Sequence, residues 1–200
     1  MAGSSDAIRG RARTFLRTAA FAGYSAAALA AFELHLRTVA PEAVAPLRAQ
    51  YKRKVGADLL RVLGVEWQVL PSPGSPSEDA LVYEAPERPR LVVSNHRTAL
   101  DIGVLLAHFA GSMLSRAEVE RWPVFGRLAS HGQTIFVDRS DKSSGARAIR
   151  QIRSALMSGR TVVAFPEGTT LAGDEVRPFQ GGVFAATRGL DVDIIPVGLA

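Results

Sequence analysis

The sequence contains no cysteine among its 200 residues. This absence excludes a disulfide framework, a thiol nucleophile and any cysteine-ligated metal site. The sequence also lacks a Gly-x-Ser-x-Gly motif, so it does not predict a serine hydrolase elbow. A glycine-rich nucleotide loop with its lysine is missing too. Other side chains must therefore supply any chemistry that this chain performs.

Internal repeats and low-complexity tracts are absent as well, and the composition, 47% hydrophobic and 22% charged, is that of a folded globular protein. The net charge of +5 and the pI of about 10.2 indicate an anionic partner. Nucleic acid, an anionic membrane and a phosphorylated substrate all fit. Because the sequence has no zinc finger, RNA-binding aromatic motif or long Lys/Arg run, we expect no nucleic acid partner.

Four arginines lie in residues 9–17, and the following stretch, 18–32, has no charged residue. The stretch is shorter than the roughly 20 apolar residues that a spanning helix needs. We favour a membrane-embedded or interfacial helix with a basic flank. A soluble helix packed on the domain and a signal peptide, with Ala-Leu-Ala at 28–30 as a cleavage site, are the alternatives.

A second, amphipathic helix with a basic face is predicted over 47–63. The two helices predict an N-terminal helical membrane-associating segment over residues 1–63. Residues 64–200 are predicted to form the catalytic domain.

The remaining sequence alternates short apolar runs with helical stretches. Residues 65–70 alternate apolar and polar side chains like a half-buried strand, and 71–79 have the composition of a loop. Further strands are predicted over 80–84, 91–95, 112–115, 134–138, 161–165 and 193–198. Helices are predicted over 99–110, 121–130, 142–158 and 181–188. This order predicts an α/β fold with a mostly buried sheet flanked by helices.

Polar residues follow three of the predicted strands. His96 lies in the loop after the first, and Asp101 falls in the first turn of the next helix. The pair can meet only if His96 folds back, and a carboxylate on one imidazole nitrogen would leave the other as a base. A surface histidine with a helix-capping aspartate fits equally well. Arg139 follows another strand and suits either a phosphate or a surface salt bridge.

Glu167 directly follows Pro166 at the end of an apolar strand, and Gly168 allows the backbone to approach a ligand closely. A carboxylate at the exit of a buried strand needs a partner or has a task.

Together and in this order, these stretches resemble the motifs of the lysophosphatidic acid acyltransferase family of glycerolipid acyltransferases. The first motif, Asn-His-x-x-x-x-Asp, corresponds to residues 95–101, and the third, Phe-Pro-Glu-Gly-Thr, to residues 165–169. The second, a glycine followed by an apolar strand and an arginine, corresponds to 132–139, and the fourth to 195–197. The resemblance covers residues 80–198.

The resemblance implies an acyltransferase of the glycerolipid type. It would move a fatty acyl group from acyl-CoA or acyl-ACP to the free hydroxyl of lysophosphatidic acid, with no metal and no bound cofactor. His96 would be the general base and Asp101 its orienting partner. The substrate-binding residues that it implies are Arg139, Glu167, Gly168, Thr169 and, as a second cation, Arg116. Backbone amides near Gly168 or after His96 would hold the oxyanion.

The resemblance also implies a membrane-associated protein at the cytoplasmic face of the inner membrane. Many members have Arg or Ser where this chain has Thr170, and Lys where it has Gln180. These differences make another lysolipid, such as a lyso-ornithine lipid, the alternative acceptor. The chain ends inside the fourth motif, so we expect it to be shortened at its C-terminus. A hydrolase and a non-enzymatic lipid-binding module remain alternatives. A hydrolase would release free fatty acid, and a binding module would catalyse no reaction, so acyl transfer would exclude both.

Overall fold

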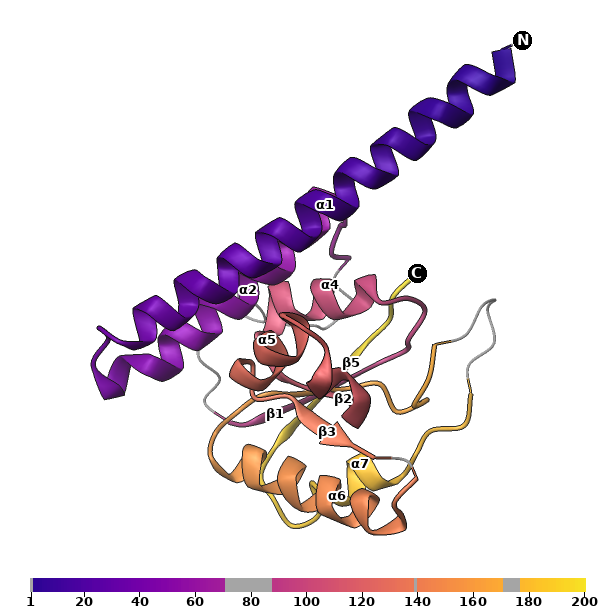
Figure 1. The fold of residues 1–200 in the computed structure, drawn as a ribbon. Helices are drawn as coiled ribbons and strands as arrows, with labels where there is room; N and C mark the ends of the chain where they lie inside the picture. The colour runs from indigo at the N-terminus through magenta and orange to yellow at the C-terminus, as the bar shows by residue number, and fades with distance from the viewer. Residues whose placement is uncertain (1, 71–87, 139, 171–176) are drawn as a thin grey trace.

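The computed structural model of the chain describes residues 2–70, 88–138, 140–170 and 177–200 (Figure 1). Its elements, in chain order, are α1 (Ala2–Leu36), η1 (Pro41–Ala43), α2 (Val44–Leu63), β1 (Arg90–Ser94), α4 (Leu100–Phe109), β2 (Ser112–Arg116), η2 (Ala117–Arg121), α5 (Phe125–His131), β3 (Ile135–Val137), α6 (Lys142–Met157), β4 (Val162–Ala164), α7 (Gly182–Ala185) and β5 (Asp193–Val197). The predicted loop over 71–79 and strand over 80–84 lie outside the described residues.

The five strands form one parallel sheet in the order β3-β2-β4-β1-β5. Their apolar runs match the five strands predicted between residues 91 and 198, each end within one residue. The α/β fold class is therefore confirmed. Because all strands are parallel, their carboxyl ends meet at one edge of the sheet, and β1 lies there directly beside β4.

Both faces of the sheet are covered, as alternating side chains of the same strand show. Leu91 and Val93 point into a core built with α6 and α7. Val92 points to the opposite face, where it packs with Leu105 of α4. Strands buried on both faces read as continuous apolar runs, which is why the sequence predicted them accurately.

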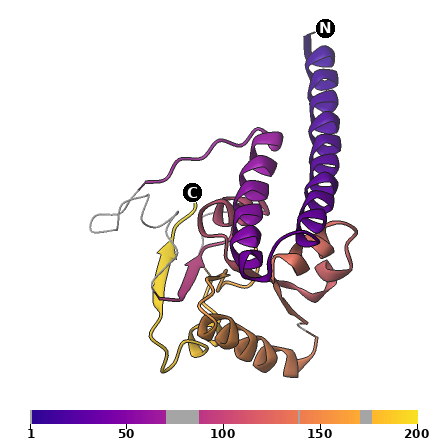
Figure 2. The same cartoon turned by 90° about the vertical axis from the view of Figure 1, so that its left-hand side faces the viewer.

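Helix α2 lies over α4 and contacts it closely (Figure 2). A Cβ atom placed on Gly56 of α2 would lie 2.7 Å from the carbonyl oxygen of Gly103 in α4. Gly103 in turn accommodates Leu60, whose side chain is fully buried. These small residues bring the two helix axes together, and α2 thereby forms an outer layer over the sheet.

Helix α1 is longer than the charge-free stretch that predicted it, and its two halves differ. Its C-terminal half packs on α2 and α5, where Leu29 and Phe32 are buried. Residues 11–20 are exposed, and the N-terminal half extends away from the rest of the protein (Figure 1). Residues Gly10–Leu36 form a helix that is long and apolar enough to cross a membrane, by length and composition alone.

Three sequence predictions are corrected by the structure. Residues 65–70 show the predicted alternation of half-buried and exposed side chains but pair with no strand in the described part of the chain. The helix predicted over 121–130 begins only at Phe125, because Pro123 and a turn at Val124 interrupt it. The helix predicted over 181–188 is a single turn, α7.

Candidate active site

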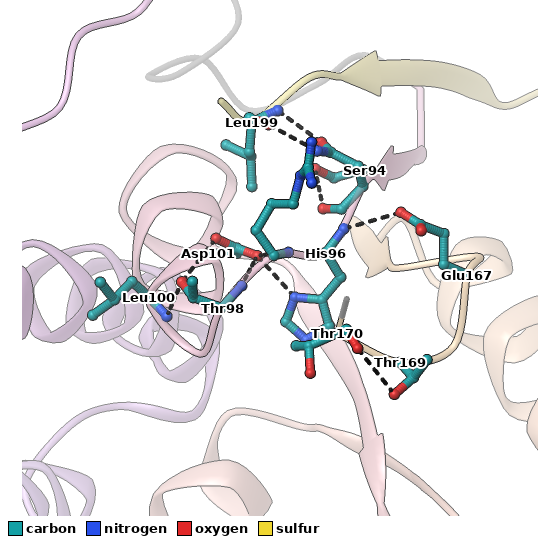
Figure 3. Close-up of polar contacts among 11 residues, drawn as sticks. Ser94, His96, Thr98, Leu100, Asp101, Glu167, Thr169, Thr170 and Leu199 are labelled. Atoms are coloured by element: carbon teal, nitrogen blue, oxygen red, sulfur yellow. Dashed lines mark hydrogen bonds and ion pairs between the residues drawn. The ribbon is translucent and has the colours of Figure 1, made fainter. Parts of the chain in front are cut away.

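His96 lies just beyond the carboxyl end of β1 and folds back toward the next helix (Figure 3). Its Nδ1 lies 2.9 Å from Oδ2 of Asp101, in the first turn of α4. A carboxylate accepts from an N–H, so this contact assigns the proton of a neutral imidazole to Nδ1 and leaves a lone pair on Nε2. The structure thus brings together the two residues predicted as base and partner.

Asp101 is buried, with 7% of its surface exposed, and its carboxylate is held by the backbone. Oδ2 also accepts from the backbone N–H of Arg97, at 2.6 Å, and of Thr98, at 2.9 Å. Oδ1 accepts from the hydroxyl of Thr98. The N-terminal end of α4 adds a favourable dipole to these bonds. This network fixes the orientation of the carboxylate that faces His96.

Glu167 approaches His96 from the other side, because β4 is the neighbour of β1. Its carboxylate is buried, with 6% exposed, and its two oxygens bind two different segments. Oε1 accepts from the backbone N–H of His96, at 3.2 Å, and Oε2 from that of Arg177, at 3.1 Å. Glu167 therefore ties together the loops that follow β1 and β4.

A tight turn presents Glu167. The N–H of Gly168 donates to the carbonyl of Phe165 at 2.9 Å, with the buried Pro166 at the second position of the turn. Gly168 has φ of +75°, a conformation that favours glycine. The N–H of Gln180 donates to the carbonyl of Pro166 and holds the returning chain against the turn.

Sequence reasoning gave no role to two residues that the structure places against His96 and its loop. The ring of Phe165 stacks on the imidazole of His96, with centroids 3.8 Å apart and planes at 12°. The amide of Asn95 exchanges two hydrogen bonds, each 2.7 Å, with the backbone of Leu199 beyond β5. Both lie inside the sequence motifs, Asn95 directly before His96 and Phe165 two residues before Glu167, and that closeness is the only signal in the sequence.

The other predicted residues have different settings. Arg116 is exposed at the carboxyl end of β2, at the same edge of the sheet as His96 but two strands away. Arg139 lies outside the described residues. Thr169 is beside the turn, and its hydroxyl donates to the carbonyl of Thr170 at 3.5 Å (Figure 3).

The backbone amides expected to hold an oxyanion are used within the protein. Those of Arg97 and Thr98 donate to Asp101, and that of Gly168 donates to Phe165. These three N–H groups therefore already have acceptors within the protein.

The profile of the family described as "Acyltransferase" matches residues 77–200. The chain belongs to the acyltransferase family. Its members include a relative from Pseudomonas aeruginosa named lyso-ornithine lipid O-acyltransferase, 36% identical over 193 residues, which are 95% of this chain and 69% of that protein. The family resemblance drawn from the motifs is thereby confirmed.

Two further proteins are similar to this chain, one in sequence and one in fold. A protein from Neisseria gonorrhoeae named 1-acyl-sn-glycerol-3-phosphate acyltransferase is 30% identical over 58% of this chain, which spans 46% of its length. The crystal structure of the 1-acyl-sn-glycerophosphate acyltransferase PlsC from Thermotoga maritima superposes with a TM-score of 0.70 over 94% of this chain and 83% of that one. At 17% identity, that match establishes the fold.

Proposed function

We propose that this acyltransferase moves a fatty acyl group from a thioester, acyl-CoA or acyl-ACP, to the free hydroxyl of a lysolipid. The observation that supports this most directly is the His96–Asp101 pair at the carboxyl edge of the sheet. In α/β proteins this edge is where ligands bind. A hydroxyl is a weak nucleophile at neutral pH, so the reaction needs a base of this kind.

In the proposed reaction, Nε2 of His96 takes the proton of the lysolipid hydroxyl as its oxygen attacks the thioester carbonyl. The carbon–sulfur bond then breaks, and the departing thiolate receives the same proton. The products are the acylated lipid and free thiol. Asp101 balances the positive charge that His96 holds between the two steps. Because the acyl group passes directly between substrates, no cysteine or serine nucleophile is needed.

Glu167 was expected to help position the acceptor, but its contacts support a different role. Both of its oxygens accept backbone N–H groups, one of them from His96 itself. We therefore assign Glu167 to holding the His96 loop in place. Phe165, stacked on the imidazole, limits rotation of the same side chain. Gly168 and Thr169 stay proposed as acceptor contacts, since they continue the turn at this edge.

Cations near the site would bind the anionic part of the acceptor. Arg139 is proposed for this role because it follows β3, and Arg116 because it is exposed at the end of β2. Two acceptors have support, lysophosphatidic acid and a lyso-ornithine lipid. The second is favoured by the name of the Pseudomonas relative, which matches over nearly the whole chain, and by Thr170 and Gln180.

Helix α1 supports attachment to the membrane in which such an acceptor resides. One face of its C-terminal half packs on the protein, where Leu29 and Phe32 are buried, whereas residues 11–20 are all exposed. They include Arg11, Arg13 and Arg17, which suit lipid headgroups. We propose that this half of α1 lies in the interface, at the cytoplasmic face of the inner membrane.

The test is an acyl-transfer assay in detergent micelles with labelled acyl-CoA or acyl-ACP and a panel of lysolipids. Product from a lyso-ornithine lipid, lost in His96→Ala, is the expected result. Product from lysophosphatidic acid alone would keep the mechanism and change the acceptor. Release of free fatty acid without any acylated lipid would identify a hydrolase and contradict the proposal.

A further inference from the structure

A short loop after η2 exposes a tryptophan side chain. Tryptophan and tyrosine are the aromatic residues enriched at membrane interfaces, and tryptophan is the larger. Arg121, Trp122 and Pro123 are consecutive exposed residues, and Trp122 is 57% exposed. The only other tryptophan, Trp67, is partly buried and donates to Nε2 of His108 at 2.8 Å. An indole left in water exposes a large apolar surface that usually has a partner.

The loop holds Trp122 rigidly. Val124 has φ of +62° and ψ of −59°, and the N–H of Phe125 donates to the carbonyl of Pro123 at 2.6 Å. This is a γ-turn of the rare, strained kind, centred on a β-branched residue. The N–H of Gly126 donates to the carbonyl of Trp122, and a Cβ on Gly126 would lie 2.1 Å from the carbonyl oxygen of Glu120. Strain of this sort persists where it serves a function.

The position of the loop relative to α1 indicates its partner. Phe125 stacks on Phe21 of α1, with ring centroids 5.3 Å apart. Phe21 is also the point at which α1 leaves the protein, because residues 11–20 are exposed. Two large apolar side chains on that free segment, Phe15 and Leu16, are 72% and 66% exposed. Trp122 precedes this contact by three residues, so its loop adjoins the part of α1 where the segment proposed to enter the membrane begins.

We propose that Trp122 is a second membrane anchor, whose indole inserts into the headgroup layer beside the free half of α1. This inference rests on the membrane attachment proposed above. Tryptophan is enriched at this depth because its apolar ring and polar N–H suit both sides of the interface. Two anchors, α1 and the loop that contains Trp122, would fix the orientation of the protein on the membrane. They would turn the carboxyl edge of the sheet toward its lipid substrate.

The Trp122 loop carries no excess of positive charge that would attract it to an anionic membrane. Arg116 and Arg121 are matched by the exposed Glu118 and Glu120 in the same short stretch. The binding contributed by Trp122 should therefore depend little on salt. The dependence on salt should come from the arginines of α1, which have no carboxylate among residues 11–20.

The test uses the two tryptophans as separate reporters in the 200-residue chain. Trp67→Phe leaves Trp122 as the only tryptophan, and Trp122→Phe leaves Trp67 as the matched control. Each is mixed with vesicles of phosphatidylethanolamine and phosphatidylglycerol, with and without bromine on the acyl chains near the headgroup. We expect brominated lipid to quench about half or more of the Trp122 emission and to leave Trp67 unaffected, as insertion of one ring requires.

Sedimentation with the same vesicles measures the binding itself. Trp122→Ala should weaken partitioning by roughly 5- to 20-fold, the effect of losing one inserted aromatic side chain, at both low and high salt. Circular dichroism confirms that each variant is folded. If the protein binds vesicles but brominated lipid does not quench Trp122, or if Trp122→Ala binds as tightly as the unaltered protein, this inference is overturned. Membrane attachment through α1 would then still stand. Failure of the unaltered chain to bind vesicles would contradict both.

Discussion

The two edges of the sheet hold charges of opposite sign, buried carboxylates at one edge and half-buried cations at the other. At the carboxyl edge, the carboxylates of Asp101 and Glu167 accept hydrogen bonds from backbone N–H groups. At the amino edge, two cations of α2 donate to backbone carbonyls. Nζ of Lys52 contacts the carbonyls of Ala110 and Gly111 at 2.9 and 3.1 Å, and Nε of Arg48 contacts that of His131 at 2.7 Å.

The geometry of the fold explains this separation. In a parallel α/β sheet each helix returns antiparallel to the strands, so helix N-termini gather at the carboxyl edge and C-termini at the other. The first edge therefore offers N–H groups and positive dipole ends, and the second offers carbonyls and negative ends. Here α4 supplies both, since its first turn contains Asp101 and its last residue precedes Ala110. One edge is suited to chemistry and the other to holding α2 on the domain.

The largest expected effect comes from removing charge at the carboxyl edge. Asp101→Asn leaves the imidazolium of His96 without a balancing carboxylate, and we expect kcat to fall on the order of 10³- to 10⁴-fold. The measurement is steady-state acyl transfer, with the exposed Asp191→Asn as the matched control. A loss below tenfold in a folded Asp101→Asn protein would argue against the proposed base.

Glu167→Gln tests whether the second carboxylate positions His96 or contacts the acceptor. A glutamine side chain has one oxygen, so it can accept from only one of the two backbone N–H groups. Its NH₂ group would face the second N–H, donor against donor. We expect kcat to fall roughly 10- to 100-fold, the effect of a small displacement of a catalytic group, with little change in the KM for the acceptor. Glu66→Gln, at an exposed position, is the control. A rise in KM at constant kcat would indicate acceptor contact instead.

The sequence predicted this carboxyl edge better than its supporting contacts. His96 and Asp101 lie five residues apart, and the strand-to-helix turn between them follows from local pattern. The stack of Phe165 on His96 and the clamp of Asn95 on Leu199 depend instead on β1 lying between β4 and β5. Strand order is a property of the folded chain, and a single sequence does not encode it in any local period.

The same distinction explains the errors in secondary structure. Residues 65–70 do alternate, with Val65, Trp67 and Val69 half-buried, but alternation reports which side is buried and not whether a strand lies beside it. In the predicted helix over 121–130, the apolar pattern masked Pro123, which the structure places in a γ-turn. The five sheet strands were predicted well because burial on both faces leaves continuous aliphatic runs.

At the amino edge the expected effect is on stability and its pH dependence. Burial, with Arg48 and then Arg160 as nearby charges, lowers the pKa of Lys52 from 10.5 to about 7. Below pH 7 the folded and unfolded chains are both protonated here, and the full penalty for burying the charge is present. Between about pH 7 and 10.5 the unfolded chain retains the proton longer, so the free energy of unfolding rises with pH.

Lys52→Met removes this titration. The free energy of unfolding of the unaltered protein, relative to Lys52→Met, should therefore increase from pH 7 to 9.5. The increase should not exceed about 1.4 kcal/mol per pH unit, because the folded and unfolded chains differ here by at most one proton. Urea denaturation at several pH values measures it, with the exposed Lys54→Met on the same helix as control. A flat or falling difference would contradict this account of the amino edge.

The smallest effect is expected for Arg48→Gln, which tests whether the two cations of the amino edge, Arg48 and Lys52, influence each other. It removes the bond to the carbonyl of His131, and we expect a loss of about 1 kcal/mol in the free energy of unfolding near neutral pH. It also removes a positive charge beside Lys52, so the pKa of Lys52 should rise and the pH-dependent increase should begin at a higher pH.

The exposed Arg37→Gln is the control for Arg48→Gln. Because removing the Arg48 charge also reduces the penalty on Lys52, the double variant Arg48→Gln/Lys52→Met should lose more stability than the two single losses combined. Strict additivity in a double-mutant cycle would mean that the two cations do not interact and that only the carbonyls of the helix ends hold them. Acyl transfer should be unchanged in all of these variants, since none of them alters the carboxyl edge.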